Sequence, residues 1–233
     1  PGIRSDSDMH TLGYPFRPWR DGKALADGPS ILRYVEETAA EYGVDGKVRL
    51  RHRLVSADWD SATARWTLHV DHDGARQTLT CSFLFSCTGY YRYDHGHEPL
   101  IEGRDDYAGT VVHPQHWPQD LDVAGRRIVV IGSGATAVTL VPALAREAAH
   151  VVMLQRSPTY VVSRPGVDPV AAALQKVLPE EAAFRAVRGK NIAVAAASYR
   201  ASKRWPDRMR AILMKGVAGQ LPEGYDVETH FGP

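Results

Sequence analysis

The feature that most constrains the fold is a glycine-rich turn between an apolar run and a helical pattern. The run Arg127–Ile131 is Arg-Ile-Val-Val-Ile, which is typical of a buried parallel strand. The turn then follows the pattern G-x-G-x-x-A, and the helical pattern continues to about Ala149. Between a strand and a helix, this motif predicts a dinucleotide-binding turn, in which glycines allow a tight bend and close approach of a pyrophosphate. The candidate binding residues are Gly132, Ser133, Gly134, Ala135, Thr136 and Ala137.

The end of the next apolar run indicates which nucleotide such a turn would hold. A second strand is predicted at Val151–Leu154, and Gln155, Arg156 and Ser157 follow it. An NAD site normally has Asp or Glu here, about 20 residues after the first glycine, to bind the ribose hydroxyls. This chain has no acid there, and Arg156 supplies a cation that could pair with a 2′-phosphate. The sequence therefore predicts NADP rather than NAD; the alternative is a glycine-rich turn without a ligand.

The remaining periodicities predict an α/β fold with an antiparallel β-meander. Apolar residues recur at helical spacing from Ile31 to Tyr42, with Gly28-Pro29 before them and Gly43 after them. Alternation then predicts three strands, and the apolar run 83–87 predicts a buried strand. In chain order we expect a loop over 1–27, strands at 49–59, 65–71, 76–81 and 83–87, a linker over 91–125, and mostly helix over 169–219.

Composition excludes several classes of protein. The formal net charge is +1, so no global field favours nucleic acid, and contact with a membrane is not expected. The two cysteines, Cys81 and Cys87, are too few for a disulfide scaffold and suit the cytoplasm; we expect both to be small buried residues. The basic cluster between Arg200 and Arg210 is interpreted as a solvated helix face, with a membrane-surface role as the lesser alternative.

A longer motif lies just before the glycine-rich turn. Residues 107–118 are Tyr-Ala-Gly-Thr-Val-Val-His-Pro-Gln-His-Trp-Pro. This string resembles the fingerprint F-x-G-x-x-x-H-x-x-x-W-P of Baeyer–Villiger monooxygenases, with Tyr107 in place of Phe. Flavin-containing monooxygenases have a similar string with Tyr or Phe where Trp117 stands. Its fingerprint residues here are Tyr107, Gly109, His113 and Trp117.

A second resemblance begins at Pro1, where Pro-Gly-Ile-Arg-Ser-Asp matches the family string P-G-x-x-x-D. The resemblance implies two Rossmann-like dinucleotide-binding domains, the NADP domain being inserted into an FAD domain. It also implies that the first FAD-binding glycine loop would precede Pro1, so the chain is interpreted as an internal piece of a longer protein. The expected division is a partial FAD domain with the meander at 1–106, a linker at 107–125 and an NADP domain with a helical segment at 126–233.

The resemblance further implies a reaction: NADPH reduces FAD, and O₂ forms a flavin (hydro)peroxide that oxygenates a small ketone, sulfide or amine. Carried over residue by residue, Asp6 would orient the nicotinamide, with Arg4 and Ser5 beside it. Thr88 and Gly89 would approach the flavin, and Leu54 would lend its backbone to the adenine. The fingerprint would act as a hinge between domains.

The sequence also offers alternatives to this function. His113 and His116 form H-x-x-H, but no further Asp, Glu or Cys completes a metal shell, so no metal is expected. An NADPH-dependent flavoprotein reductase would share the architecture but needs a paired-cysteine motif. A non-catalytic NADP-binding homologue remains the third possibility.

Overall fold

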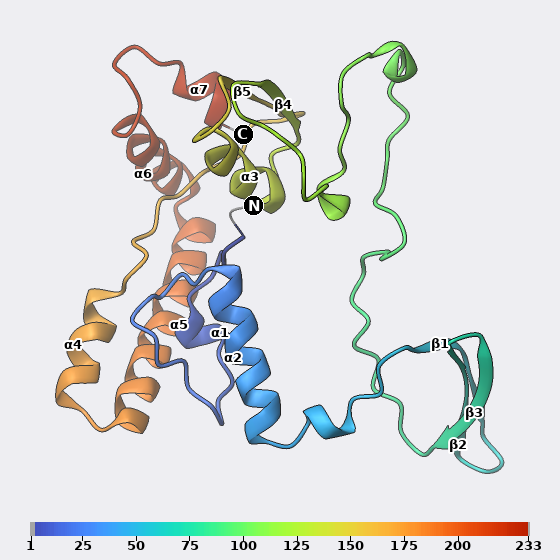
Figure 1. Cartoon of the computed structure of the whole chain (residues 1–233). Coiled ribbons are helices and arrows are strands. Elements are labelled where there is room, and N and C mark those ends of the chain that lie inside the picture. The colour runs from blue at the N-terminus through green and yellow to red at the C-terminus, as the bar shows by residue number, and fades with distance from the viewer. Residues whose placement is uncertain (1–2, 233) are drawn as a thin grey trace. The chain divides into compact units, whose positions relative to one another are not determined.

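The computed structural model describes residues 3–232, so Pro1 and Gly2 of the first family string lie outside the described residues (Figure 1). The chain divides into two compact units. Unit 1 consists of Pro1–Thr38 and Asp122–Pro233, and unit 2 is Ala39–Leu121.

A parallel strand pair with one covering helix forms the dinucleotide-type part of unit 1. Strand β4 (Arg127–Ile131) pairs in register with β5 (His150–Leu154), and helix α3 (Ala135–Leu144) connects them. Ala137, Leu140 and Leu144 are buried where α3 packs against the strands. Burying each leucine stabilises the unit by about 1.5–3 kcal/mol. The predicted order of strand, glycine turn, helix and strand is therefore confirmed.

Helix α3 ends at Leu144 rather than near Ala149, so the predicted helix was too long. After Leu144 the amides of Ala145 and Ala148 still bond to the last turn of the helix, and the backbone then bonds to the segment that enters β4. The carbonyl of Glu147 accepts the Gly125 amide at 3.0 Å, and the Arg126 carbonyl accepts the Ala149 amide at 2.9 Å. These long-range bonds outweigh the local helical preference of an alanine-rich segment.

The N-terminal part of unit 1 packs around a small aromatic core. Helix α2 (Gly28–Glu41) has the predicted position, and Gly43 follows it with a φ of 61°. The Tyr34 hydroxyl is held on both sides: it accepts from the Tyr14 amide at 2.8 Å and donates to the Arg17 carbonyl at 2.5 Å. The buried residues of this core are Met9, Trp19, Ala26 and Tyr34.

The expected loop over 1–27 contains one short helix, α1 (Met9–Leu12). Asp8 begins it by accepting a hydrogen bond from the Thr11 amide at 2.8 Å. One turn of helix has too few periodic positions to be recognised in a segment rich in Gly, Pro and Asp.

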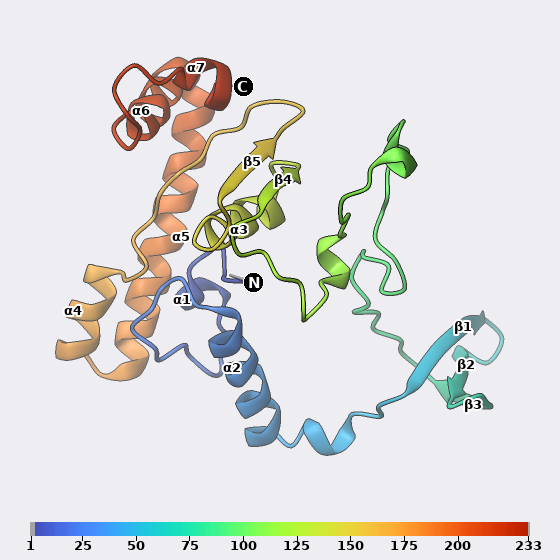
Figure 2. The ribbon, with the colours of Figure 1, turned by 45° about the horizontal axis from the view of Figure 1, so that its top comes forward.

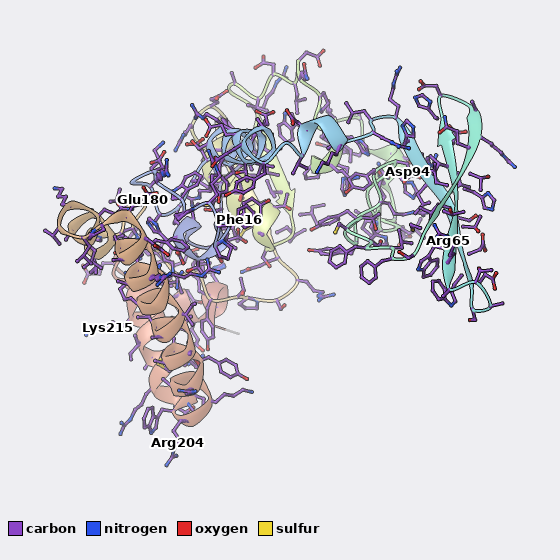
Figure 3. All side chains as sticks on the ribbon, turned by 90° about the horizontal axis from the view of Figure 1, so that it is seen from below. Phe16, Arg65, Asp94, Glu180, Arg204 and Lys215 are labelled. Atoms are coloured by element: carbon purple, nitrogen blue, oxygen red, sulfur yellow. The ribbon has the colours of Figure 1, made fainter. Side chains whose placement is uncertain are left out.

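The C-terminal part of unit 1 is helical, as predicted. It comprises α4 (Pro169–Val177), α5 (Glu180–Arg204), α6 (Pro206–Ala218) and α7 (Val227–Phe231). Helix α5 packs against α1, α4 and α6, and Figures 1 and 2 show α4 beside the N-terminal half of α5. Figure 3 shows Arg204 at the C-terminal end of α5. Within the described residues, no helix combines the length and apolarity needed to cross a membrane.

Unit 2 contains the predicted antiparallel meander. Strands β1 (His52–Asp60), β2 (Arg65–His72) and β3 (Ala75–Cys81) pair in chain order. Asp73 and Gly74 turn β2 into β3 with φ angles of 52° and 84°, the two positive values that a two-residue Asp-Gly hairpin requires. Irregular backbone with short 3₁₀ turns at Asp45–Lys47, Arg104–Asp106 and Pro114–His116 makes up most of the rest.

The predicted strand over 83–87 is absent from the described structure. Phe83 and Phe85 are 75% and 76% exposed, and Cys87 is also exposed, so the expectation that both cysteines are buried was wrong. A strand needs a neighbour for its backbone N–H and C=O groups, and no described strand pairs with this segment. An apolar run alone does not supply that partner.

Candidate functional site

The glycine turn leaves β4 in a conformation that favours glycine. Gly132 has a φ of 122°, which side-chain-bearing residues rarely adopt. Its amide donates to the Leu154 carbonyl at 2.8 Å, which extends the β4–β5 pairing by one more bond. The turn therefore bends directly beside the carboxyl end of β5, where an α/β sheet of this type binds its ligands.

No contact with the described part of the chain requires a glycine at position 134. A Cβ built on Gly134 meets no heavy atom within 4 Å, and its φ is −75°. Space is therefore open over this backbone, as close approach of a pyrophosphate requires. Gly134 therefore suits a bound dinucleotide, because the space that a side chain would occupy is left free for a ligand.

The N-terminus of α3 adds hydrogen-bond donors beside this space. Gly134 is its N-cap and provides no side-chain cap. The first bond into the helix runs from the Val138 amide to the Gly134 carbonyl at 3.0 Å, so the amides of Ala135, Thr136 and Ala137 have no acceptor in the helix. Free amides and the positive end of the helix dipole suit an anionic phosphate.

The three residues after β5 differ in what they contact. Gln155 donates from Nε2 to the His230 carbonyl at 2.7 Å, which ties the strand end to α7. Arg156 and Ser157 are exposed, and Arg156 makes no hydrogen bond or ion pair with another described residue. The structure thus brings the glycine turn and Arg156 to the same end of the strand pair and leaves the guanidinium available.

The segment Arg4–Asp6 is fixed by its backbone. Arg4 forms an isolated antiparallel bridge with Asp27, and the Ser5 amide donates to the Ala26 carbonyl at 2.8 Å. The Ser5 hydroxyl also accepts the Ala26 amide at 3.1 Å. Asp6 comes next, exposed and without a hydrogen bond to another described residue. The carboxylate of Asp6 is therefore free, while the backbone just before it is held by hydrogen bonds.

Asp27 anchors the other side of this segment as the residue before α2. Its carboxylate accepts from the Ser30 amide at 2.9 Å and from the Ser30 hydroxyl at 2.8 Å. These bonds, with a further one from Lys23, lower the pKa of Asp27 to about 2. The carboxylate is therefore charged throughout the neutral range and keeps the start of α2 capped.

The residues assigned to the flavin lie in unit 2. Leu54 precedes a β-bulge at Val55, and a cavity of about 410 Å³ is lined by Arg53, Leu54, Val55 and Asp71. Thr88 and Gly89 are exposed; the Thr88 carbonyl accepts the Tyr93 hydroxyl at 3.2 Å, and Gly89 has a φ of 69°. No hydrogen bond joins Leu54, Thr88 and Gly89 to one another among the described residues of this unit.

The fingerprint forms a short ordered turn in unit 2. His113 begins the 3₁₀ turn Pro114–His116, and its Nδ1 accepts the Gln115 amide at 3.2 Å. His113 and Trp117 are half-buried, whereas Tyr107 and Gly109 are exposed. Within the described chain, no group of three or more His, Cys, Asp or Glu residues is arranged to hold a metal ion.

One buried polar cluster was missed by the sequence analysis. His10 is only 2% exposed, and its Nε2 is buried without a hydrogen-bond partner among the described residues. Burial lowers the pKa of His10, although the charges of Asp8 and Asp168 oppose that shift. Asp8 accepts from Asn191 Nδ2 at 2.8 Å, and Lys190 pairs with Asp168. No spacing in the sequence joins residues so far apart in the chain.

The chain matches a described family and known proteins over most of its length. The family model for flavin-binding monooxygenase-like proteins matches residues 24–174. The chain is 57% identical over 234 residues to the FAD-containing monooxygenase EthA of Mycobacterium tuberculosis. It is 45% identical over 236 residues to the probable FAD-binding monooxygenase AlmA of Acinetobacter baylyi. Both alignments cover 100% of this chain but only 48% and 47% of the relatives, so the chain spans about half their length.

The chain also resembles solved structures of monooxygenases. An oxidized steroid monooxygenase bound to NADP matches with a TM-score of 0.63 and 28% identity, over 79% of this chain and 34% of that chain. OTEMO in complex with FAD and NADP matches with a TM-score of 0.60 and 26% identity, over 85% of this chain and 36% of that chain. The predicted α/β dinucleotide-binding fold class and the resemblance to monooxygenases are therefore confirmed.

Proposed function

The chain belongs to the flavin-binding monooxygenase-like family, and we propose that it is part of an NADPH- and FAD-dependent monooxygenase. The proposed reaction transfers one oxygen atom of O₂ to a small organic substrate, a ketone, sulfide or amine. The observation that carries the proposal is the turn at Gly132–Gly134, which has an obligatory bend, open space over its second glycine and free helix amides. In this family setting, those features suit a nicotinamide dinucleotide.

The NADP site would be built at the carboxyl end of the parallel strand pair, from the segments that follow β4 and β5. The turn backbone from Gly132 to Ala137 would hold the pyrophosphate, and Gln155, Arg156 and Ser157 would face the adenosine side. Arg156 supports the phosphorylated nucleotide, because an exposed guanidinium can donate two parallel hydrogen bonds to a 2′-phosphate. No described acid takes a competing place after β5.

The FAD site would take residues from the meander and from its exit. Leu54 would contribute its backbone beside the open cavity at the bulge, and Thr88 and Gly89 would contribute theirs near the ring system. The positive φ of Gly89 supports this role, because a glycine there allows another molecule to approach the backbone closely. We propose the same division as the sequence predicts: 1–106, 107–125 and 126–233.

The residues of the chain would mainly orient and shield. When bound, NADPH supplies a hydride and FAD passes the electrons to O₂. Asp6 would accept a hydrogen bond from the nicotinamide carboxamide and so fix the angle of the ring, with Arg4 and Ser5 keeping the loop in place. The fingerprint would position the domains and limit water access rather than transfer a proton. The two free cysteines favour a reducing compartment such as the cytoplasm.

The test is oxygen stoichiometry in the full-length protein. With NADPH and a panel that includes cyclohexanone and methyl phenyl sulfide, NADPH oxidation should require O₂, and ¹⁸O₂ should label the product with one atom. A flavoprotein reductase would instead oxidise NADPH under nitrogen with a disulfide or dye as acceptor. A non-catalytic homologue would bind NADPH and leave it unchanged. Either result would replace the proposed function.

A further inference from the structure

The fingerprint histidine has a fixed local geometry in unit 2. The His113 carbonyl accepts the His116 amide at 3.0 Å, while its Nδ1 accepts the Gln115 amide at 3.2 Å. The imidazole is therefore acting as the N-cap of a 3₁₀ turn, and its half-buried ring must lie against some other part of the unit.

That part is Gly96. It is the one buried residue in the stretch 82–121, and its neighbours on both sides are exposed. A Cβ built on Gly96 would overlap the His113 ring at Cε1, Nδ1 and Nε2. Gly96 is not among the glycines with positive φ, so the requirement concerns space and not backbone conformation. Only glycine leaves room for the ring at this place.

One further hydrogen bond attaches the same segment to the fingerprint, and a second contact lies within the segment. The Gln115 side-chain amide donates to the Arg92 carbonyl, and Arg92 Nη1 lies 3.2 Å from His95 Nε2. Downstream, Arg104 pairs with Glu98 at 2.6 Å and lowers the pKa of that carboxyl, with smaller contributions from His113 and His95. Asp94, labelled in Figure 3, marks this segment.

We infer that Gly96 is a positioning residue that seats the His113 imidazole and so sets the geometry of the fingerprint. The inference rests on the proposed role of the fingerprint in a monooxygenase. A methyl group at position 96 would push the ring from its rotamer. The consequence would be poorer coupling, in which NADPH is oxidised but more of the oxygen leaves as hydrogen peroxide.

The experiment is a double-mutant cycle in the full-length protein. Gly96→Ala, His113→Ala and their combination are compared with the parent, and Gly46→Ala is the control, because a Cβ on Gly46 meets nothing within 4 Å. Hydrogen peroxide per NADPH is measured with methyl phenyl sulfide present, and thermal unfolding is measured in parallel. Gly96→Ala should raise the peroxide yield about two- to tenfold, the range expected for one side chain forced off its preferred rotamer. His113→Ala should raise it at least as much, because the ring is absent.

The double variant tests whether Gly96→Ala acts through the His113 ring. If Gly96→Ala acts by displacing the ring, the double variant should leak no more peroxide than His113→Ala alone. If Gly96→Ala fails to fold, the double variant should fold as His113→Ala does, because the clashing ring is gone. Multiplying effects, or a double variant that stays unfolded, would overturn the inference while leaving the fingerprint's role intact. A His113→Ala protein with parental coupling would instead overturn that role, and this inference with it.

Discussion

The Gly132 amide donates to the Leu154 carbonyl at 2.8 Å, and this single bond joins the glycine turn to the end of β5. The two segments lie 22 positions apart in the sequence, yet their backbones are in hydrogen-bond contact. The bond therefore fixes the distance between the proposed pyrophosphate turn and the residues that would choose the nucleotide. The first two predictions follow from that arrangement.

Arg156→Ala should weaken the binding of NADPH and leave that of NADH nearly unchanged. Its guanidinium is free to pair with a 2′-phosphate, which NADH lacks, so the KM for NADPH should rise while that for NADH stays nearly constant. A charge-assisted contact of this kind is worth about 1–3 kcal/mol. Steady-state kinetics with both nucleotides measure the difference. Arg146→Ala, another exposed arginine of unit 1, is the matched control; equal losses with both nucleotides would contradict the assignment.

Substitutions at the two glycines of the turn should have different effects: one should lower the stability of the fold, and the other should lower the affinity for NADPH. Gly132→Ala places a side chain at a φ of 122° and should lower the free energy of unfolding by about 1 kcal/mol or more. Gly134→Ala adds a Cβ to open space, so stability should be kept while NADPH affinity falls. Calorimetric unfolding and NADPH titration of each variant provide the two readouts. Unchanged affinity in Gly134→Ala would show that no ligand approaches that backbone.

His10 should make the stability of the protein depend on pH. Its folded-state pKa is lowered by burial, so the fold favours the neutral ring. The corresponding stability is fully present above the unfolded pKa of 6.5 and is lost as pH falls below that value, through the folded pKa. The melting temperature of the parent should therefore fall as the pH is lowered below about 6.5. The charges of Asp8 and Asp168 oppose the lowering of the His10 pKa without reversing it, whereas the charge of Lys190 adds to it.

His10→Gln should flatten this dependence, because the variant has no titrating ring in that position. His150→Gln, at an exposed site on β5, should retain the parental slope. The carboxylates with lowered pKa, such as Asp27 with a pKa of about 2, titrate at lower pH and affect both variants alike. A parental slope in His10→Gln would assign the pH dependence to another group.

Local patterns were sufficient to predict the elements whose bonds are local or adjacent in sequence. The meander, α2 and the strand–turn–helix at β4 and α3 depend on neighbouring residues, turn glycines and simple periodicity. The strand predicted at 83–87 is absent because a strand needs a pairing partner, and no described strand pairs with this segment. Its apolar composition was correctly recognised, but composition does not establish pairing.

A motif in the sequence predicts candidate site residues, whereas packing between distant residues cannot be predicted from one sequence. Gly132 and Arg156 follow from spacing, and the structure brings their segments together. His10 is buried by α1 packing on α5, some 180 positions downstream, and Gly96 is constrained only by the ring of His113. A contact between residues far apart in the chain produces no periodic pattern in a single sequence, so it cannot be predicted from that sequence.

Asp6→Ala should slow hydride transfer. Asp6 follows the backbone bond between Ser5 and Ala26, and its exposed carboxylate has no other described partner. The proposed role is to hold the nicotinamide at a reactive angle, so removing the carboxylate should cost orientation more than affinity. Anaerobic stopped-flow absorbance of the full-length protein should show flavin reduction by NADPH slowed about 10- to 100-fold, with little change in the apparent Kd.

Two comparisons separate orientation from general damage. Asp120→Ala removes another exposed aspartate and should reduce flavin at the parental rate. Asp6→Asn keeps the size of the side chain and one acceptor oxygen, so its rate should fall between those of Asp6→Ala and the parent. Because Asp6 is exposed and has no bond to another described residue, thermal unfolding should hardly change in either variant. If Asp6→Ala reduces flavin as fast as the parent, another group orients the nicotinamide, and the role implied by the family string does not transfer to this residue.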